Sequence, residues 1–169
     1  MDNSRYPLDW VSGFISSIRP YVHLRSRDNL LILLPNQAYK MNPTAISMLE
    51  HVFDGRDIGD YLSAQDSTTS SAQQDTYYFF CDLKALVSGC LGNDHGRKAV
   101  DHVPYDVPFT SLPVLSEIAL TYRCNLACKF CYAGCNCQKV ENPGPEMTTA
   151  EAKRILRMIR DEADVPSVS

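Results

Sequence analysis

The chain has 169 residues, a formal net charge of −4, 44% hydrophobic residues and 21% charged residues. This balance gives enough apolar mass for packed domains and excludes a largely disordered chain. No apolar run approaches the roughly 18 residues of a membrane-spanning helix, and residues 1–10 do not resemble a signal peptide. We therefore expect a cytoplasmic protein without a membrane partner.

Residues 1–19 are predicted to form an N-terminal extension. Between Tyr6 and Ile18 its apolar side chains recur at helical spacing, which indicates an amphipathic segment. These side chains are Leu8, Val11, Phe14, Ile15 and Ile18. The sequence assigns this segment no role.

Three short strands are predicted next, over residues 21–25, 29–34 and 38–41, with turn residues between them. Asn42 is then a predicted N-cap, and Pro43 is at the first helical position. The buried face of this helix would consist of Ala45, Ile46, Met48, Leu49 and Val52. A second short helix has Ile58, Tyr61 and Leu62 as its apolar residues.

The polar stretch 63–74, rich in serine and threonine, is predicted to be a flexible link. Asp75 is expected to cap a third helix after it. The apolar face of that helix would hold Phe79, Leu83, Leu86, Val87 and Cys90. We interpret Cys81 and Cys90 as packing residues without a redox role.

Three small strands followed by three helices resemble the PqqD-like domain, a winged helix-turn-helix that recognises peptides in pathways that modify ribosomally made peptides. The resemblance covers roughly residues 20–91 and rests on the segments 30–34, 38–45 and 49–55. It implies that the leader segment of a precursor peptide adds as a strand, in a groove between residues 38–41 and 77–86. The alternative is that this domain docks a protein partner or serves as a scaffold.

A winged helix can also bind DNA, so a transcription regulator with an iron–sulfur cluster is a further hypothesis. DNA binding requires a basic face. Within the segment 42–62, Arg56 is the only lysine or arginine. The acidic residues there are Glu50, Asp54, Asp57 and Asp60. The charge therefore disfavours a nucleic-acid partner.

Residues 92–112 are predicted to be a linker, with Pro104, Pro108 and polar patches. His95 and His102 lie in it and are interpreted as solvated side chains. The last predicted domain covers residues 113–169. It begins with an apolar run, Leu115 to Leu120, that is typical of a strand buried on both faces.

Five cysteines follow this strand, and the first three, Cys124, Cys128 and Cys131, have the spacing Cys-x3-Cys-x2-Cys. Three thiolates on one loop can hold three irons of a cubane cluster and leave the fourth iron open. A structural zinc site normally needs four ligands in two separated pairs. A disulfide framework does not suit seven cysteines without a signal peptide, and a two-cluster ferredoxin needs a second cysteine run.

The spacing resembles the signature of the radical S-adenosylmethionine enzymes. This resemblance implies that Cys124, Cys128 and Cys131 hold a 4Fe-4S cluster and that S-adenosylmethionine chelates the open iron. Reductive cleavage of the cofactor then yields a radical that abstracts hydrogen from a substrate, with an electron donor such as flavodoxin or ferredoxin. Phe130 and Tyr132 would pack near the adenine, or serve only as ordinary packing residues.

Cys135 and Cys137 depart from this pattern. They are ligands of an auxiliary cluster, thiols that contact the substrate, or bystanders. The sequence does not choose among the three.

Thr148 and Glu151 form a predicted capping box at the start of the next helix. Its apolar stripe would contain Ala152, Ile155, Leu156, Ile159 and Ala163, and residues 165–168 would enter a second strand. The expected fold is therefore α/β: a PqqD-like winged helix-turn-helix followed by the first βα units of a partial (β/α) barrel. The Gly-Gly-Glu segment with which such enzymes continue does not occur in the sequence, so we expect an N-terminal fragment of a longer enzyme.

Overall fold

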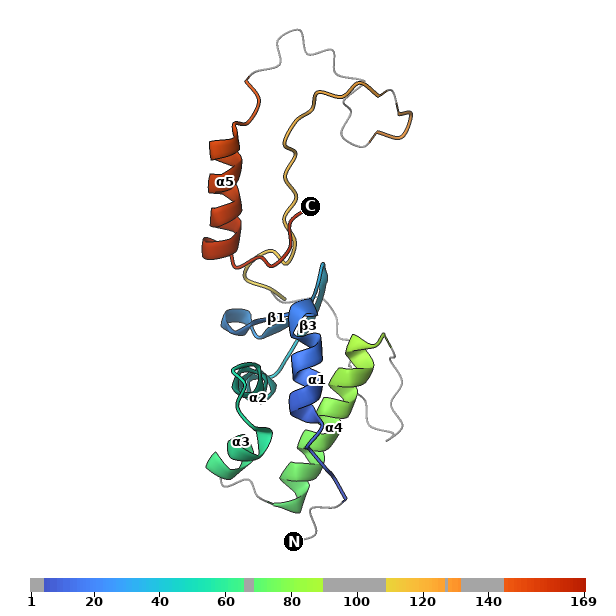
Figure 1. Cartoon of the computed structure of the whole chain (residues 1–169), viewed down its shortest axis with the longest axis vertical. Coiled ribbons are helices and arrows are strands. Elements are labelled where there is room, and N and C mark those ends of the chain that lie inside the picture. Colours follow the sequence, from blue (N-terminus) through green and yellow to red (C-terminus); the bar gives the residue numbers. More distant parts are fainter. Residues whose placement is uncertain (1–4, 66–68, 90–108, 127, 132–144) are drawn as a thin grey trace. The chain divides into compact units, whose positions relative to one another are not determined.

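Figure 1 shows a computed structural model of the chain, which describes residues 5–65, 69–89, 109–126, 128–131 and 145–169. The chain divides into two compact units, Met1–Ser111 and Leu112–Ser169. Within the described ranges, no helix is long and apolar enough to cross a membrane. Most of the predicted linker 92–112, with His95 and His102, lies outside the described residues.

The first unit contains a three-stranded antiparallel sheet in the order β1-β2-β3. The strands are β1 (Val22–Arg25), β2 (Leu30–Leu33) and β3 (Gln37–Lys40). The register places Val22 opposite Leu33 and Leu31 opposite Tyr39. The three strands predicted from the sequence are confirmed.

A 3-10 turn, η2 (Ser26–Asp28), joins β1 to β2. It ends at Asn29, whose φ of 55° lies in the left-handed region, where asparagine is several-fold enriched among residues other than glycine. This turn brings Asp28 back toward the end of β1.

The N-terminal segment forms α1 (Val11–Ile18), which continues into the 3-10 turn η1 (Arg19–Tyr21). Val11, Ile15 and Ile18 are buried in the core of the first unit, as the helical spacing predicts. The extension is therefore part of the folded unit, although no sequence pattern indicates which residues it packs against.

Two helices follow the sheet, α2 (Pro43–Phe53) and α3 (Ile58–Ala64). The Asn42 side chain accepts a hydrogen bond from the Ala45 amide at 2.8 Å, which confirms the predicted N-cap. The five residues predicted for the buried face of α2 are all buried. Gly55 (φ 84°) follows α2 and supplies the left-handed conformation that commonly ends a helix.

The third helix after the sheet, α4 (Ser70–Val87), corrects three predictions. It begins earlier than expected, because Thr69 rather than Asp75 is the N-cap and accepts a hydrogen bond from the Ala72 amide at 3.3 Å. Residues 70–74 are therefore helical and do not belong to a link. Phe80 is fully buried where Phe79 was expected, and Cys90 lies outside the described residues.

The earlier start is possible because threonine, like aspartate, is a favoured N-cap residue, and the Thr69 hydroxyl accepts from the Ala72 amide. Phe80 is central because it shares a helical stripe with Thr76 and Leu83 at spacings of four and three residues. These three side chains are all buried. Each large apolar side chain buried in this way contributes roughly 1.5–3 kcal/mol.

The second unit contains α5 (Thr149–Arg157), which continues into a π-type turn, η3 (Met158–Glu162). The segment before the cysteines pairs in parallel with the end of the chain through a bridge between Ser116 and Val168. The Ser116 amide donates to the Ser167 carbonyl at 3.1 Å, and the Ser169 amide donates to the Ser116 carbonyl at 3.0 Å. Parallel neighbours with a helix between them are the arrangement of a β-α-β connection.

The prediction that residues 115–120 form a strand buried on both faces is wrong for this structure. Leu120 is 59% exposed, and the segment is extended with only a bridge to its parallel neighbour among the described residues. A single neighbour covers one edge and neither face, so the apolar side chains stay accessible. Leu156 on the stripe of α5 is likewise 44% exposed. The fold class is mixed α/β.

Candidate functional site

The three predicted cluster ligands lie on the loop that follows the extended segment 114–123. Cys124 is exposed, and Cys128 and Cys131 are half-buried. The Cys131 amide donates to the Cys128 carbonyl at 3.2 Å, which makes a tight turn between the second and third thiols. The Leu126 amide donates to Cys124 Sγ at 3.4 Å. Hydrogen bonds of this kind to a ligating sulfur tune a cluster's reduction potential.

The structure does not gather these thiols as ligands. Among the described residues, no group of three or more His, Cys, Asp or Glu side chains lies close enough to hold a metal ion. The chemistry of the donor set still fits an iron–sulfur cluster. Three thiols occur within eight residues, 124–131, and soft thiolates favour iron–sulfur clusters, zinc or copper(I) over metals that prefer oxygen.

The other predicted site residues divide into two groups. Phe130 is 89% exposed, immediately before the third cysteine. Tyr132, Cys135 and Cys137 lie outside the described residues. Tyr122 and Leu126, which are 62% and 60% exposed, add further apolar surface along the same loop.

Glu146 was not singled out from the sequence, yet it joins the two ends of the cysteine loop. Thr121 Oγ1 hydrogen-bonds to Glu146 Oε1, and Arg123 Nε lies 3.3 Å from the same oxygen. The Arg123 amide donates to Thr121 Oγ1 at 2.9 Å, so the three side chains form one network. No local pattern reveals a contact over 25 residues of sequence.

The capping box that follows Glu146 is confirmed. Thr148 Oγ1 accepts from the Glu151 amide at 3.2 Å, and Glu151 Oε2 accepts from the Thr148 amide at 2.8 Å. The Thr148 amide and hydroxyl both donate to the Glu151 carboxylate, and these two hydrogen bonds lower its pKa. The N-cap of α5, Thr148, therefore lies two residues after Glu146.

Comparison of the chain with protein-family models, with curated proteins and with solved structures found no match. The functional argument therefore rests on the residues and their arrangement.

In the first unit, β3 is one of the two edge strands of the described sheet, since its one neighbour there is β2. An edge strand offers unpaired backbone groups to an added strand. Tyr39 on β3 and Phe79 on α4 both pack against the hydrophobic core. The groove predicted from the sequence would run between these two elements.

The N-terminal segment packs against α4, which the sequence did not indicate. The Tyr6 ring lies 5.7 Å from the rings of both Tyr77 and Tyr78. Trp10 contacts Tyr77 edge to face at 6.4 Å, and Lys84 Nζ lies 5.3 Å from the Trp10 ring centre. Part of the α4 surface within residues 77–86 is therefore covered by the chain's own aromatic side chains.

Proposed function

We propose that this chain is part of a radical S-adenosylmethionine enzyme that modifies a peptide or protein substrate by hydrogen abstraction. The observation that carries the proposal is the Cys-x3-Cys-x2-Cys spacing of Cys124, Cys128 and Cys131 directly after an extended apolar segment. The two alternatives that the sequence raises, a structural zinc site and a disulfide framework, need ligand or cysteine patterns that this loop lacks.

In this proposal Cys124, Cys128 and Cys131 would hold a 4Fe-4S cluster, with S-adenosylmethionine as its cofactor. The cluster, when bound and reduced, supplies the electron that cleaves the cofactor. Cys124 is the most accessible of the three thiols. Phe130, whose ring is exposed, would pack near the adenine, and Tyr132 would line the same site.

The second unit supports this proposal through its connectivity. The loop that bears the cysteines leaves one strand-like segment, and the chain returns through α5 to pair in parallel with that segment. Active sites of α/β barrels lie on the loops at the carboxyl ends of their strands. In such a barrel the loop after residues 114–120, which bears the cysteines, would lie at this end.

For the first unit we propose a PqqD-like winged-helix role, the capture of a leader peptide. The support is the order of three strands and three helices and the edge position of β3. Strand addition takes its affinity from main-chain hydrogen bonds. The leader would add beside β3, and the core of the same peptide would react at the cluster.

The test is anaerobic reconstitution of the chain with iron and sulfide, followed by metal analysis and EPR of the reduced form. We expect about four irons per chain, a cluster signal that is lost in Cys124→Ala, and no loss in the matched control Cys81→Ala. Cys81 is a half-buried thiol on α4 of the first unit. Tightly bound zinc without an iron–sulfur signal would refute the proposal.

Peptide capture is tested separately, by fluorescence anisotropy with a short precursor peptide encoded beside the gene. Binding of its leader half, without binding of its core half, is the expected result. If the chain assembles the cluster but binds neither half of the peptide, the proposed enzyme activity still stands. The proposed capture of a leader peptide by the first unit would then be refuted.

A further inference from the structure

A buried ion pair lies at one corner of the sheet in the first unit. Arg25, the last residue of β1, is 1% exposed, and Asp28, in η2, is 7% exposed. The pair is bidentate, with Arg25 Nε 3.0 Å from Asp28 Oδ1 and Arg25 Nη2 3.0 Å from Asp28 Oδ2. Two parallel hydrogen bonds make this one of the stronger types of ion pair.

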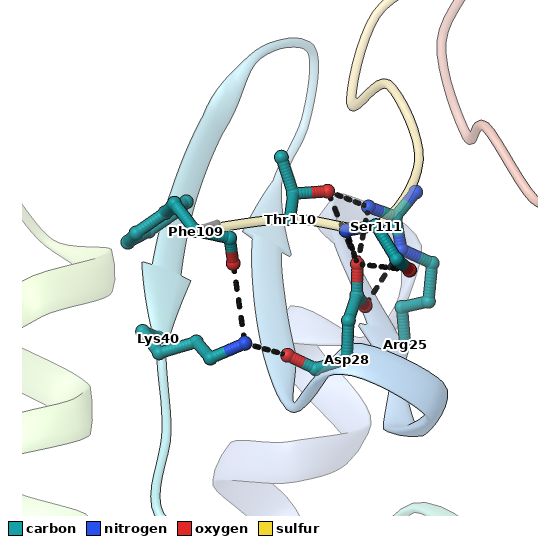
Figure 2. Close-up of polar contacts among 6 residues, drawn as sticks. All are labelled: Arg25, Asp28, Lys40, Phe109, Thr110 and Ser111. Carbon is teal, nitrogen blue, oxygen red and sulfur yellow. Dashed lines mark hydrogen bonds and ion pairs between the residues drawn. The ribbon is translucent and has the colours of Figure 1, made fainter. Parts of the chain in front are cut away.

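A second segment completes this corner, as Figure 2 shows. Residues 109–111, which we call the strap, belong to the same compact unit. The Thr110 hydroxyl accepts from Arg25 Nη2 at 2.7 Å and donates to Asp28 Oδ2 at 3.0 Å. The Ser111 amide and hydroxyl donate to the same oxygen at 3.0 and 3.1 Å.

Lys40, at the end of β3, fixes the other end of the strap. Its Nζ donates to the Phe109 carbonyl at 3.1 Å and also to the Asp28 carbonyl. The strap is therefore held by the side chains of Arg25, Asp28 and Lys40, which come from the two outer strands and the turn after β1.

These contacts stabilise the buried Arg25–Asp28 ion pair. Two buried charges repay their desolvation only when additional hydrogen bonds satisfy their remaining donors and acceptors. Three of the donors to Asp28 Oδ2 come from a segment more than 80 residues later in the chain. Without the strap, this oxygen would keep Arg25 as its side-chain donor among the described contacts.

We propose that the Arg25–Asp28 corner is a binding site for a short peptide segment with hydroxyl and amide donors, and that the strap is its resident ligand. The site holds the chain one residue before Leu112, where the second unit begins. The corner thus sets the point at which the chain leaves the first unit. This proposal does not depend on the cysteine chemistry.

The test is residue-resolved hydrogen exchange of the whole chain under native conditions. The Ser111 amide should be protected in the wild type, because it donates to a buried carboxylate. Thr110→Val keeps the shape of the side chain and leaves the ion pair intact, but removes the hydroxyl that bridges Arg25 and Asp28. We expect it to accelerate Ser111 exchange about tenfold or more, as the loss of a hydrogen bond to a charged group predicts.

Asp28→Asn should accelerate Ser111 exchange further, because the amide cannot accept all the donors that face it. The matched control is Asp54→Asn, in the exposed pair with Arg56, which should leave Ser111 exchange unchanged. The amides of β2 report whether the sheet stays folded in each variant. Exchange of Ser111 at the unprotected rate in the wild type, or at the wild-type rate in Thr110→Val, would overturn the proposal.

Discussion

Asp28 keeps its carboxylate charged to an unusually low pH. Burial by itself raises the pKa of this group, but hydrogen bonds from Arg25, Ser111 and Thr110 outweigh it and lower the pKa from 3.8 to about 2. The unfolded chain has the ordinary value. The stability that Asp28 contributes is therefore present above pH 4 and is lost as the pH falls toward 2.

This shift predicts a specific loss of stability in acid. The wild type should lose about 2 kcal/mol of unfolding free energy between pH 4 and pH 2 that Asp28→Asn does not lose. Urea unfolding at a series of pH values measures the difference. The exposed control Asp54→Asn should keep the wild-type slope, and an identical slope in Asp28→Asn would contradict the low pKa.

Glu146 is expected to position the cysteine loop, a role that rests on the proposed cluster. Glu146→Ala removes the contacts to Thr121 and Arg123 and should speed the loss of reconstituted iron to a chelator. The effect should be no more than about fivefold, because the pair with Arg123 is exposed and such pairs contribute roughly 0–1 kcal/mol. Glu146→Gln, which keeps a hydrogen-bond acceptor for Thr121, should restore part of the retention.

Asp161→Asn, in the exposed pair with Arg160 at the far end of the helix, is the control for Glu146. A wild-type chain that takes up no cluster would refute the proposed function. A wild-type chain that holds iron as long as Glu146→Ala does would refute the positioning role alone.

At the scale of elements, α1 is a structural part of the first unit. Val11 is fully buried and Ile15 is 3% exposed, in a core shared with Leu49 and Phe80. Ile15→Ala should therefore lower the unfolding free energy by about 2–5 kcal/mol. Ser16→Ala, on the exposed side of α1, should change it by less than about 0.5 kcal/mol in chemical denaturation. Equal effects of the two substitutions would mean that α1 is not packed.

The capping box of α5 gives a second prediction at this scale. Thr148→Ala removes the side-chain acceptor for the Glu151 amide and should destabilise the helix start by about 1 kcal/mol. Hydrogen exchange of the Glu151 amide should accelerate about fivefold. Thr149→Ala, one position later and without a capping contact, is the matched control. An unchanged Glu151 amide in Thr148→Ala would show that the box does not stabilise α5.

At the scale of the whole molecule, the net charge distinguishes the peptide-capture hypothesis from the DNA-binding hypothesis. The net charge is −4, and α2 and α3 with the turn between them carry more acidic than basic side chains. We expect no measurable binding of duplex DNA at about 0.15 M salt, because such binding depends on neutralising phosphates. A mobility-shift titration tests this, and binding that weakens steeply with salt would favour the regulator hypothesis.

Most of the first unit could be predicted from the sequence, because its signals are local. The Asn42 cap, the buried face of α2 and the amphipathic α1 each depend on residues within a few positions of one another. The predicted start of α4 was wrong because Thr69 and Asp75 can both serve as an N-cap. Which of them caps the helix depends on whether the turn between them packs against the rest of the unit. In the candidate cluster site, the Cys-x3-Cys-x2-Cys spacing predicts three thiols on one loop. It does not predict the distances between them.

The contacts made by the strap and by Glu146 could not be predicted at all. Asp28 meets Ser111 across 83 residues, and Thr121 meets Glu146 across 25. Both contacts join an acidic side chain to hydroxyl groups, which are common in any surface loop. Without a periodic pattern, only the folded chain shows which pairs meet.

The strap also determines where this protein can be divided for recombinant expression. A boundary anywhere from residue 90 to residue 108 would yield a first unit without Thr110 and Ser111. The Asp28 carboxylate would then be exposed to water, although the product would still contain all the helices and strands that the structure describes in that unit. A boundary after Ser111 retains the strap, so a domain prepared with that end should be the more soluble and the more resistant to proteases.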